Sequence, residues 1–188
     1  NYRNSKEILK VAYDILVNNL SEEHIENSEL EISDPEFAVR TSPEPILLQC
    51  NDLEEEIAYA VQLMHENADV AEEKEENHSG CIAVAGYTQF EIEEFAKKVK
   101  LNVLNGSQKR FDDNVFISDL EQTKGYEFDT VVIVNCNDGV LPPVGVPTQE
   151  LYRFVSQFYV AMTRAKHQLV FSYSKNLSPW LSNQDLGL

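Results

Sequence analysis

The sequence carries little positive charge. Among its 188 residues, 15 Lys and Arg stand against 32 Asp and Glu, so the formal net charge is −17 at pH 7. Phosphate contacts from Lys and Arg supply most non-specific affinity for nucleic acids, which argues against a basic groove built by this chain alone. Much of the acid lies in residues 21–36 and 66–76, where we expect solvated helix ends or loops.

Cysteine and long apolar runs are also scarce. Cys50, Cys81 and Cys136 lie far apart and form no Cys-x-x-Cys or Cys/His cluster, so the sequence predicts no metal site. We expect three reduced, largely buried thiols in a cytoplasmic protein. No apolar run approaches the roughly 20 residues of a membrane span, and no signal peptide is visible, so we expect no membrane partner.

Two signatures of phosphate binding are absent. No Gly-x-x-x-x-Gly-Lys-Ser/Thr loop occurs, so the chain lacks the loop that cradles the phosphates of a nucleotide. The apolar run Val131–Val134 is followed by Asn135, Cys136 and Asn137, and not by an acidic pair that would hold Mg²⁺. We therefore expect this chain by itself to hydrolyse no nucleotide.

Four stretches have the apolar spacing of amphipathic helices. The first is expected over about residues 5–20. The residues that we expect to cap the four helices are Asn4, Asp52, Thr88 and Thr148. The first three are followed three positions later by Glu, as in a capping box. A Glu-rich loop is expected over residues 66–79, and a turn with little else over residues 101–114.

Short apolar runs between the helices indicate strands. They cover residues 46–50, 81–85, 115–117, 130–134 and 168–173. The alternation predicts an α/β fold with a largely parallel sheet and helices on both faces. With 43% hydrophobic residues, residues 1–188 are expected to form a single domain. The chain begins without Met, so we expect a fragment of a longer protein.

Three separate segments stand out for their charged and aromatic residues. They are Asn1-Tyr-Arg-Asn-Ser5, Gln122-Thr-Lys-Gly-Tyr-Glu-Phe-Asp129 and Tyr159-Val-Ala-Met-Thr-Arg-Ala-Lys166. In this order and spacing they resemble motifs IV, V and VI of superfamily 1 helicases of the UvrD/Rep/PcrA type. Asp138-Gly-Val-Leu-Pro142 also resembles the loop that follows motif V in these enzymes. The resemblance covers the whole chain and implies the second, C-terminal RecA-like (P-loop NTPase-type) domain of an ATP-dependent DNA helicase.

The resemblance also implies a role for individual residues in ATP hydrolysis. Arg3 and Arg164 would be catalytic arginines that reach the γ-phosphate, a group that suits a planar guanidinium fork. Tyr2 would stack on the adenine, and Glu127 would accept a hydrogen bond from the ribose. Gly125 would let the backbone approach the nucleotide closely. The phosphate loop and the Mg²⁺ ligands would belong to an upstream RecA-like domain of the same protein.

Each of these residues has a plainer interpretation too. Arg164 follows a predicted helix, where a cation interacts favourably with the helix dipole. Arg3 and Tyr2 could be solvated residues near the chain start, and Glu127 a turn carboxylate.

The predicted nucleic-acid contacts depart from the family pattern. Where the helicases have Thr and His at the start of motif V, this chain has Asp119 and Glu121, which would repel phosphate. Tyr87 and Gln89 replace the Arg and Asn of a family Arg-Thr-Asn string. Tyr87 could stack on a base or be an ordinary core or surface tyrosine. We take Tyr87, Gln89 and Thr123 as the candidate contacts to single-stranded DNA, or RNA.

One family feature cannot fit. Helicases of the UvrD type carry a large helical insertion between motifs IV and V. Here the last helix before motif V is expected to end near Lys100, and the next strand begins at Val115. The sequence therefore predicts a compact relative without the insertion.

Three functions remain open. The first is the second motor domain of an ATP-dependent DNA helicase or translocase. The second is a nucleic-acid-associated ATPase switch without unwinding, which docks on a protein partner through its acidic surface. The net charge of −17, Asp119 and Glu121 favour this alternative. The third, an α/β binding module without nucleotide, leaves the two arginine motifs unexplained.

Overall fold

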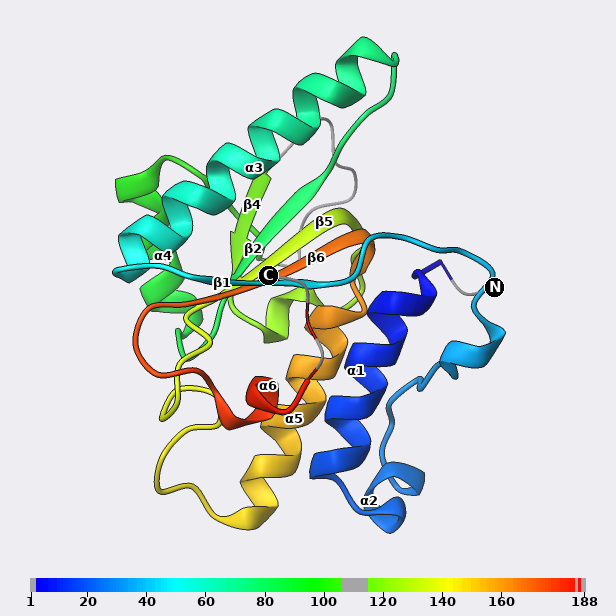
Figure 1. The fold of residues 1–188 in the computed structure, drawn as a ribbon. Coiled ribbons are helices and arrows are strands. Elements are labelled where there is room, and N and C mark those ends of the chain that lie inside the picture. Colours follow the sequence, from blue (N-terminus) through cyan, green and yellow to red (C-terminus); the bar gives the residue numbers. More distant parts are fainter. Residues whose placement is uncertain (1–2, 106–114, 185, 187–188) are drawn as a thin grey trace.

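The computed structural model describes residues 3–105, 115–184 and 186 (Figure 1). Its centre is a six-stranded sheet with the order β1-β6-β5-β2-β4-β3, in which every pairing is parallel. The strands are β1 (Ile46–Gln49), β2 (Gly80–Val84), β3 (Asn102–Val103), β4 (Val115–Ser118), β5 (Phe128–Val134) and β6 (Ala165–Tyr173). The predicted α/β fold with a parallel sheet is confirmed.

Helices cover both faces of this sheet (Figure 1). The helices are α1 (Lys6–Asn19), α2 (Glu22–Glu26), α3 (Leu53–Glu73), α4 (Gln89–Val99), α5 (Thr148–Met162) and α6 (Pro179–Ser182), with 3₁₀ turns at η1 (Pro35–Phe37) and η2 (Glu121–Thr123). One hydrophobic core lies between the sheet and the pair α1 and α5. The other lies between the sheet and the pair α3 and α4. The fold is thus a three-layer arrangement.

The middle strand β5 explains why its sequence is continuously apolar. Val131 and Ile133 belong to the core under α1 and α5, whereas Val132 and Val134 belong to the core under α3 and α4. Successive side chains of a strand point to opposite faces, and a strand covered on both faces needs apolar residues at each position. β5 is therefore a rigid support for the segment that precedes it.

The connection between β3 and β4 is short. β3 pairs with β4 through Asn102 and Val103, so the expectation of a turn without a strand over residues 101–114 was wrong at its start. A strand of two residues can form here because the side of β4 that faces away from β2 has backbone N–H and C=O groups available for pairing. The remaining part, residues 106–114, lies outside the described residues. Since β4 begins at Val115, no large helical insertion separates the two halves of the sheet, as predicted.

Two of the predicted helix caps were wrong. The side chain of Ser5, not Asn4, accepts a hydrogen bond from the Ile8 N–H at the start of α1. Asn4 is used elsewhere, as described below. At α5 the cap position is Pro147, and Thr148 is the first helical residue. The fixed φ of a proline prepares the chain for a helix without a side-chain cap. The caps at Asp52 and Thr88 are confirmed.

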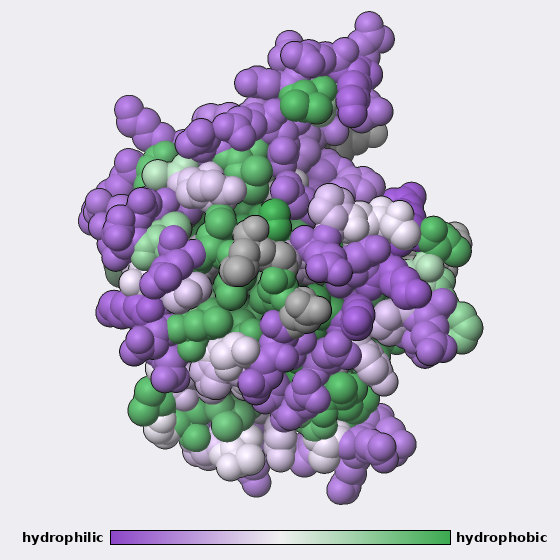
Figure 2. Space-filling model, viewed as in Figure 1, coloured by the Kyte–Doolittle hydropathy of each residue, from purple (hydrophilic) through white to green (hydrophobic). Residues whose placement is uncertain are grey.

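Helix α3 is longer than the sequence indicated. The expected loop over residues 66–79 was wrong in its first half, because α3 continues to Glu73. Glu and Ala are good helix formers, and like charges one turn apart oppose a helix by only a few tenths of a kcal/mol. Ala71 is buried and anchors this half against the protein. Figure 2 shows the projecting end of α3, at the top of the view, covered mostly by hydrophilic side chains.

Candidate functional site

The motif residues lie where β5 and β6 begin. Glu127 immediately precedes β5, and Arg164 immediately precedes β6. These strands are parallel neighbours, and the Phe128 N–H donates to the Arg164 carbonyl at 2.9 Å. Open α/β sheets usually bind ligands at the carboxyl ends of their strands. In this chain, by contrast, Glu127 and Arg164 are held side by side at the amino ends.

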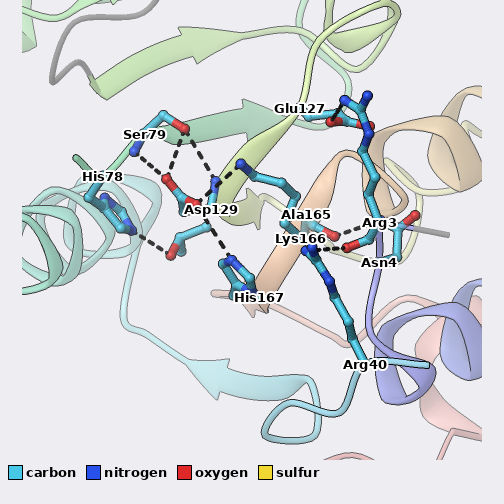
Figure 3. A network of polar contacts seen from close by, with 11 residues as sticks. Arg3, Asn4, Arg40, His78, Ser79, Glu127, Asp129, Ala165, Lys166 and His167 are labelled. Carbon is cyan, nitrogen blue, oxygen red and sulfur yellow. Dashed lines mark hydrogen bonds and ion pairs between the residues drawn. The ribbon is translucent and has the colours of Figure 1, made fainter. Parts of the chain in front are cut away.

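Arg3 joins this edge from the other end of the sequence. Its Nη1 lies 2.7 Å from Oε2 of Glu127, and the two side chains are 69% and 35% exposed (Figure 3). The hydrogen bond and the charge of Glu127 raise the pKa of the Arg3 guanidinium. An ion pair this exposed contributes little to stability because water screens it. The pair can therefore open at low cost.

Arg164 is half-buried and held by its own helix end. Its Nε donates to the Val160 carbonyl at 3.1 Å, and its Nη2 lies 3.4 Å from the Thr163 hydroxyl. Burial lowers the pKa of the Arg164 guanidinium, and the carboxylates of Glu127 and Glu31 oppose that effect. An arginine stays charged under such conditions. The contact with Val160 also fits the plainer role of a cation at a helix C-terminus.

A cleft of about 650 Å³ opens beside Arg164. Lys124 and Gly125 line one side of it, and Glu31 lines another. Gly125 has a φ of +88°, and a Cβ at this position would meet no atom within 4 Å. Glycine is favoured at this position because the positive φ suits a residue without Cβ. Among the described residues, no neighbouring atom is close enough to exclude a side chain.

Asn4 holds the backbone around Arg164. Its Nδ2 donates to the carbonyls of Thr163 at 2.6 Å and of Ala165 at 2.7 Å. These carbonyls belong to the two residues that flank Arg164. Sequence reasoning assigned Asn4 to the α1 cap and missed this contact, because no local pattern links residue 4 to residues 163–165.

A second polar cluster lies next to this edge, around Asp129 (Figure 3). Its carboxylate accepts from the Ser79 N–H at 2.8 Å and lies 3.4 Å from Lys166 and 3.7 Å from His167. Burial opposes ionisation of Asp129, but the Ser79 hydrogen bond and the charge of Lys166 outweigh it, so the pKa of Asp129 is lowered. The cluster ties the starts of β2, β5 and β6 together. It was not foreseen from the sequence.

Two of the three predicted nucleic-acid residues, Tyr87 and Gln89, lie at the opposite edge of the sheet. Tyr87 and Gln89 line a groove of about 520 Å³, together with the loop after β5. Tyr87 is half-buried, and its ring meets Phe95 edge-on with centroids 6.2 Å apart. Gln89 contacts Glu93 at 3.5 Å. One face of Tyr87 is therefore used in packing while the residue still borders the groove.

Two of the residues before β5 turn inward. Asp119 is 8% exposed, and its Oδ1 accepts from the Gln122 N–H at 2.8 Å. Thr123 is fully buried, and its hydroxyl donates to the Leu120 carbonyl at 2.8 Å. The side chain of Thr123 accordingly does not reach the surface of this chain. Glu121 is exposed and lines the groove.

Several other predictions have only a partial answer in the structure. Tyr2, the candidate adenine-stacking residue, lies outside the described residues. Among the described residues, no group of three or more His, Cys, Asp and Glu could hold a metal ion. None of the helices in the described ranges is long and apolar enough to cross a membrane. Cys81 and Cys136 are buried free thiols, and Cys50 is half-buried.

Comparison with known proteins places the chain in a family. Residues 61–176, more than half of the chain, match the UvrD-like helicase C-terminal domain; this range includes Glu127 and Arg164 but not Arg3. The structure is similar to the C-terminal domain of a possible DNA helicase from Lactobacillus plantarum WCFS1, with a TM-score of 0.66 and 21% identity, covering 98% of this chain and 94% of that chain. No curated protein matches the sequence. The chain belongs to the family of UvrD-like helicase C-terminal domains.

Proposed function

We propose that this domain forms one wall of the ATP cleft of an ATP-dependent DNA helicase or translocase. A RecA-like domain upstream in the same protein would form the other wall and bring the phosphate loop and the Mg²⁺ ligands. The observation that carries the proposal is the convergence of Arg3, Glu127 and Arg164 on one edge of the sheet. They come from three segments that are remote in sequence.

The chemistry of these side chains fits the role. In phosphoryl transfer, negative charge spreads over the γ-phosphate oxygens, and a guanidinium supplies donors in a matching planar fork. Among the described residues, Nη1 of Arg164 donates no hydrogen bond, while Nε and Nη2 anchor the group at the end of α5. An arginine held in this way is ready to contact phosphate with little further ordering.

Glu127 would receive the ribose of ATP. Its carboxylate is paired with Arg3, and both partners are accessible. Because water screens an exposed pair and leaves it little net stability, a ribose hydroxyl can replace the guanidinium of Arg3. Arg3 is then available for the γ-phosphate. Nucleotide binding and release of the arginine are thereby linked through Glu127.

The groove at Tyr87 and Gln89 is the candidate path for single-stranded DNA, or RNA. It adjoins the Arg164 cleft, since Leu120, Glu121 and Arg153 line both hollows. A closing motion of the ATP cleft would therefore move residues that border the groove. An aromatic ring at its wall suits stacking on a base without sequence preference.

A protein-docking ATPase switch is the second candidate. It is favoured by Glu121, an exposed carboxylate in the groove, and by the net charge of −17. Both weaken contacts with a phosphate backbone. In this alternative the same arginines serve ATP hydrolysis, and the acidic surface receives a protein.

The test is the ATPase activity of the full-length helicase with and without a single-stranded oligonucleotide. Strong stimulation is expected for a nucleic-acid motor, with this chain alone inactive. ATP turnover that does not change with the oligonucleotide would contradict the motor and favour the protein-docking ATPase switch. Lys97→Ala is a suitable control, since Lys97 pairs with Glu94 on the exposed face of α4, away from both hollows.

A further inference from the structure

A single side chain connects the two arginine segments. The amide of Asn4 donates to the carbonyl of Thr163 at 2.6 Å. It also donates to the carbonyl of Ala165 at 2.7 Å, a contact drawn in Figure 3. Asn4 directly follows Arg3 in the chain, and Thr163 and Ala165 directly flank Arg164. The two segments are thus joined by side chain and backbone within one short region of the sheet edge.

The backbone geometry explains why these carbonyls need a donor. Backbone carbonyls along an extended segment alternate in direction. The Arg164 carbonyl points to β5, where the Phe128 N–H donates to it, so that of Ala165 points to the other side. On that side β6 pairs with β1, but the pairing begins only at Val170. Thr163 is the C-cap of α5, with φ −77° and ψ 1°, and its carbonyl is one of those that a helix end leaves without an intrahelical donor. Asn4 supplies both missing donors.

As a result, the backbone of Arg164 is fixed on every side. Its N–H donates to the Ala161 carbonyl at 3.2 Å, and its own carbonyl accepts from Phe128 at 2.9 Å. With Asn4 bound to both neighbours, the peptide planes around Arg164 cannot rotate without breaking hydrogen bonds. Loss of their donors would leave these partly buried carbonyls unsatisfied, which is unfavourable.

Asn4 is not needed to begin helix α1. Ser5 accepts the capping hydrogen bond from Ile8, and the Lys6 N–H donates to the Arg40 carbonyl at 2.9 Å. Arg40 also reaches the Arg3 carbonyl with Nη1 at 3.4 Å. The path of the chain before α1 is therefore set by other contacts, and the Asn4 amide acts on the strand start.

We propose that Asn4 is a positioning residue that sets Arg164 for contact with the transferring phosphoryl group. The proposal rests on the proposed function, in which Arg164 serves ATP hydrolysis. It goes beyond that function by assigning the geometry of Arg164 to one amide. A displacement of about 1 Å in a catalytic group can lower the rate as much as 10²-fold.

The experiment compares Asn4→Ala and Asn4→Asp in the full-length helicase. Asp keeps the shape of the side chain and removes both donors. Each variant is expected to lower kcat for ATP roughly tenfold to a hundredfold, with a smaller change in KM. Asn19→Ala is the matched control: its amide donates to the Ile15 carbonyl at 2.7 Å at the far end of α1, and kcat should be unchanged. Near-normal kcat in either folded Asn4 variant would overturn the proposal.

A double-mutant cycle separates positioning from a general effect on folding. In an Arg164→Ala background, Asn4→Ala should reduce turnover by no more than about twofold, because the group that it positions is gone. If the fold losses in turnover of the two single variants multiply in the double variant, Asn4 acts independently of Arg164. That result would contradict the proposal. If Arg164→Ala alone leaves turnover unchanged, the proposed function itself fails. If Arg164→Ala lowers turnover but the Asn4 variants do not, only the proposed role of Asn4 is contradicted.

Discussion

The Arg3 guanidinium lies 2.7 Å from the Glu127 carboxylate, although the two residues are 124 positions apart in sequence. The fold brings them together because α1 packs on α5 and β5 starts beside β6. An exposed pair of this kind adds little stability. Its position at the proposed nucleotide cleft therefore suggests a functional reason for the contact.

Replacing Glu127 should weaken ATP binding. We expect Glu127→Ala in the full-length helicase to raise the KM for ATP severalfold, because the ribose loses its acceptor. The free energy of unfolding should change by less than about 1 kcal/mol. Steady-state ATPase assays and urea denaturation measure the two effects. Glu94→Ala, which removes another exposed carboxylate paired with a cation, should alter neither; an unchanged KM in Glu127→Ala would argue against the ribose contact.

Arg164 should not tolerate replacement by lysine. Arg164→Lys keeps the positive charge but loses the planar fork and the Nε contact to Val160. Turnover is expected to fall roughly tens-fold or more, while the melting temperature stays close to that of the unaltered protein. A lysine variant with normal turnover would reduce Arg164 to the role of a charged helix end.

Tyr87 should contribute to binding of single-stranded DNA. Tyr87→Ala is expected to weaken binding by about 1–3 kcal/mol if one base stacks on the ring, and Tyr87→Phe should retain most of the affinity. Fluorescence anisotropy with a labelled oligonucleotide measures both. Tyr59→Ala is the control, since Tyr59 is an exposed tyrosine on α3. Equal affinities for Tyr87→Ala and the control would remove Tyr87 from the interface.

Asp129 should make stability depend on pH in the acid range. Its pKa in the folded chain is lowered from about 3.9 in an unfolded chain. Its contribution is therefore full above about pH 4 and is lost as the pH falls through the lower folded value. Asp129→Asn should lower the free energy of unfolding by about 1–2 kcal/mol at pH 7.

The difference between Asp129→Asn and the unaltered chain should shrink as the pH falls below about 4. Urea denaturation at a series of pH values measures it. Asp69→Asn, at an exposed position on α3, should show no such difference. A constant gap across the acid range would mean that ionised Asp129 does not stabilise the fold.

The parallel sheet could be predicted because short local stretches of the sequence identify its strands. Continuous apolar runs such as Val131–Val134 require cover on both faces, and capping boxes such as that of Thr88 and Glu91 mark helix starts. In both of these features neighbouring residues suffice. Motif order also singled out Arg3, Glu127 and Arg164 as candidate site residues, which stays a prediction.

Long-range use of polar side chains could not be predicted. Asn4 is attractive as a local cap, but its amide instead satisfies carbonyls at residues 163 and 165. Asp129 looked like an ordinary motif residue, and an irregular register between β5 and β6 at Phe128/Thr130 places it among Ser79 and Lys166. Such contacts depend on which strands become neighbours, and that information is spread over the whole chain.

The most direct test of the central claim is a structure of the full-length helicase with a non-hydrolysable ATP analogue and Mg²⁺. Arg164 and Arg3 are expected within about 3 Å of γ-phosphate oxygens, with Glu127 released from Arg3 and bound to the ribose. An analogue held with Arg3 still paired to Glu127, and with Arg164 turned away from the phosphates, would contradict the assignment of this domain as the arginine-bearing wall of the cleft.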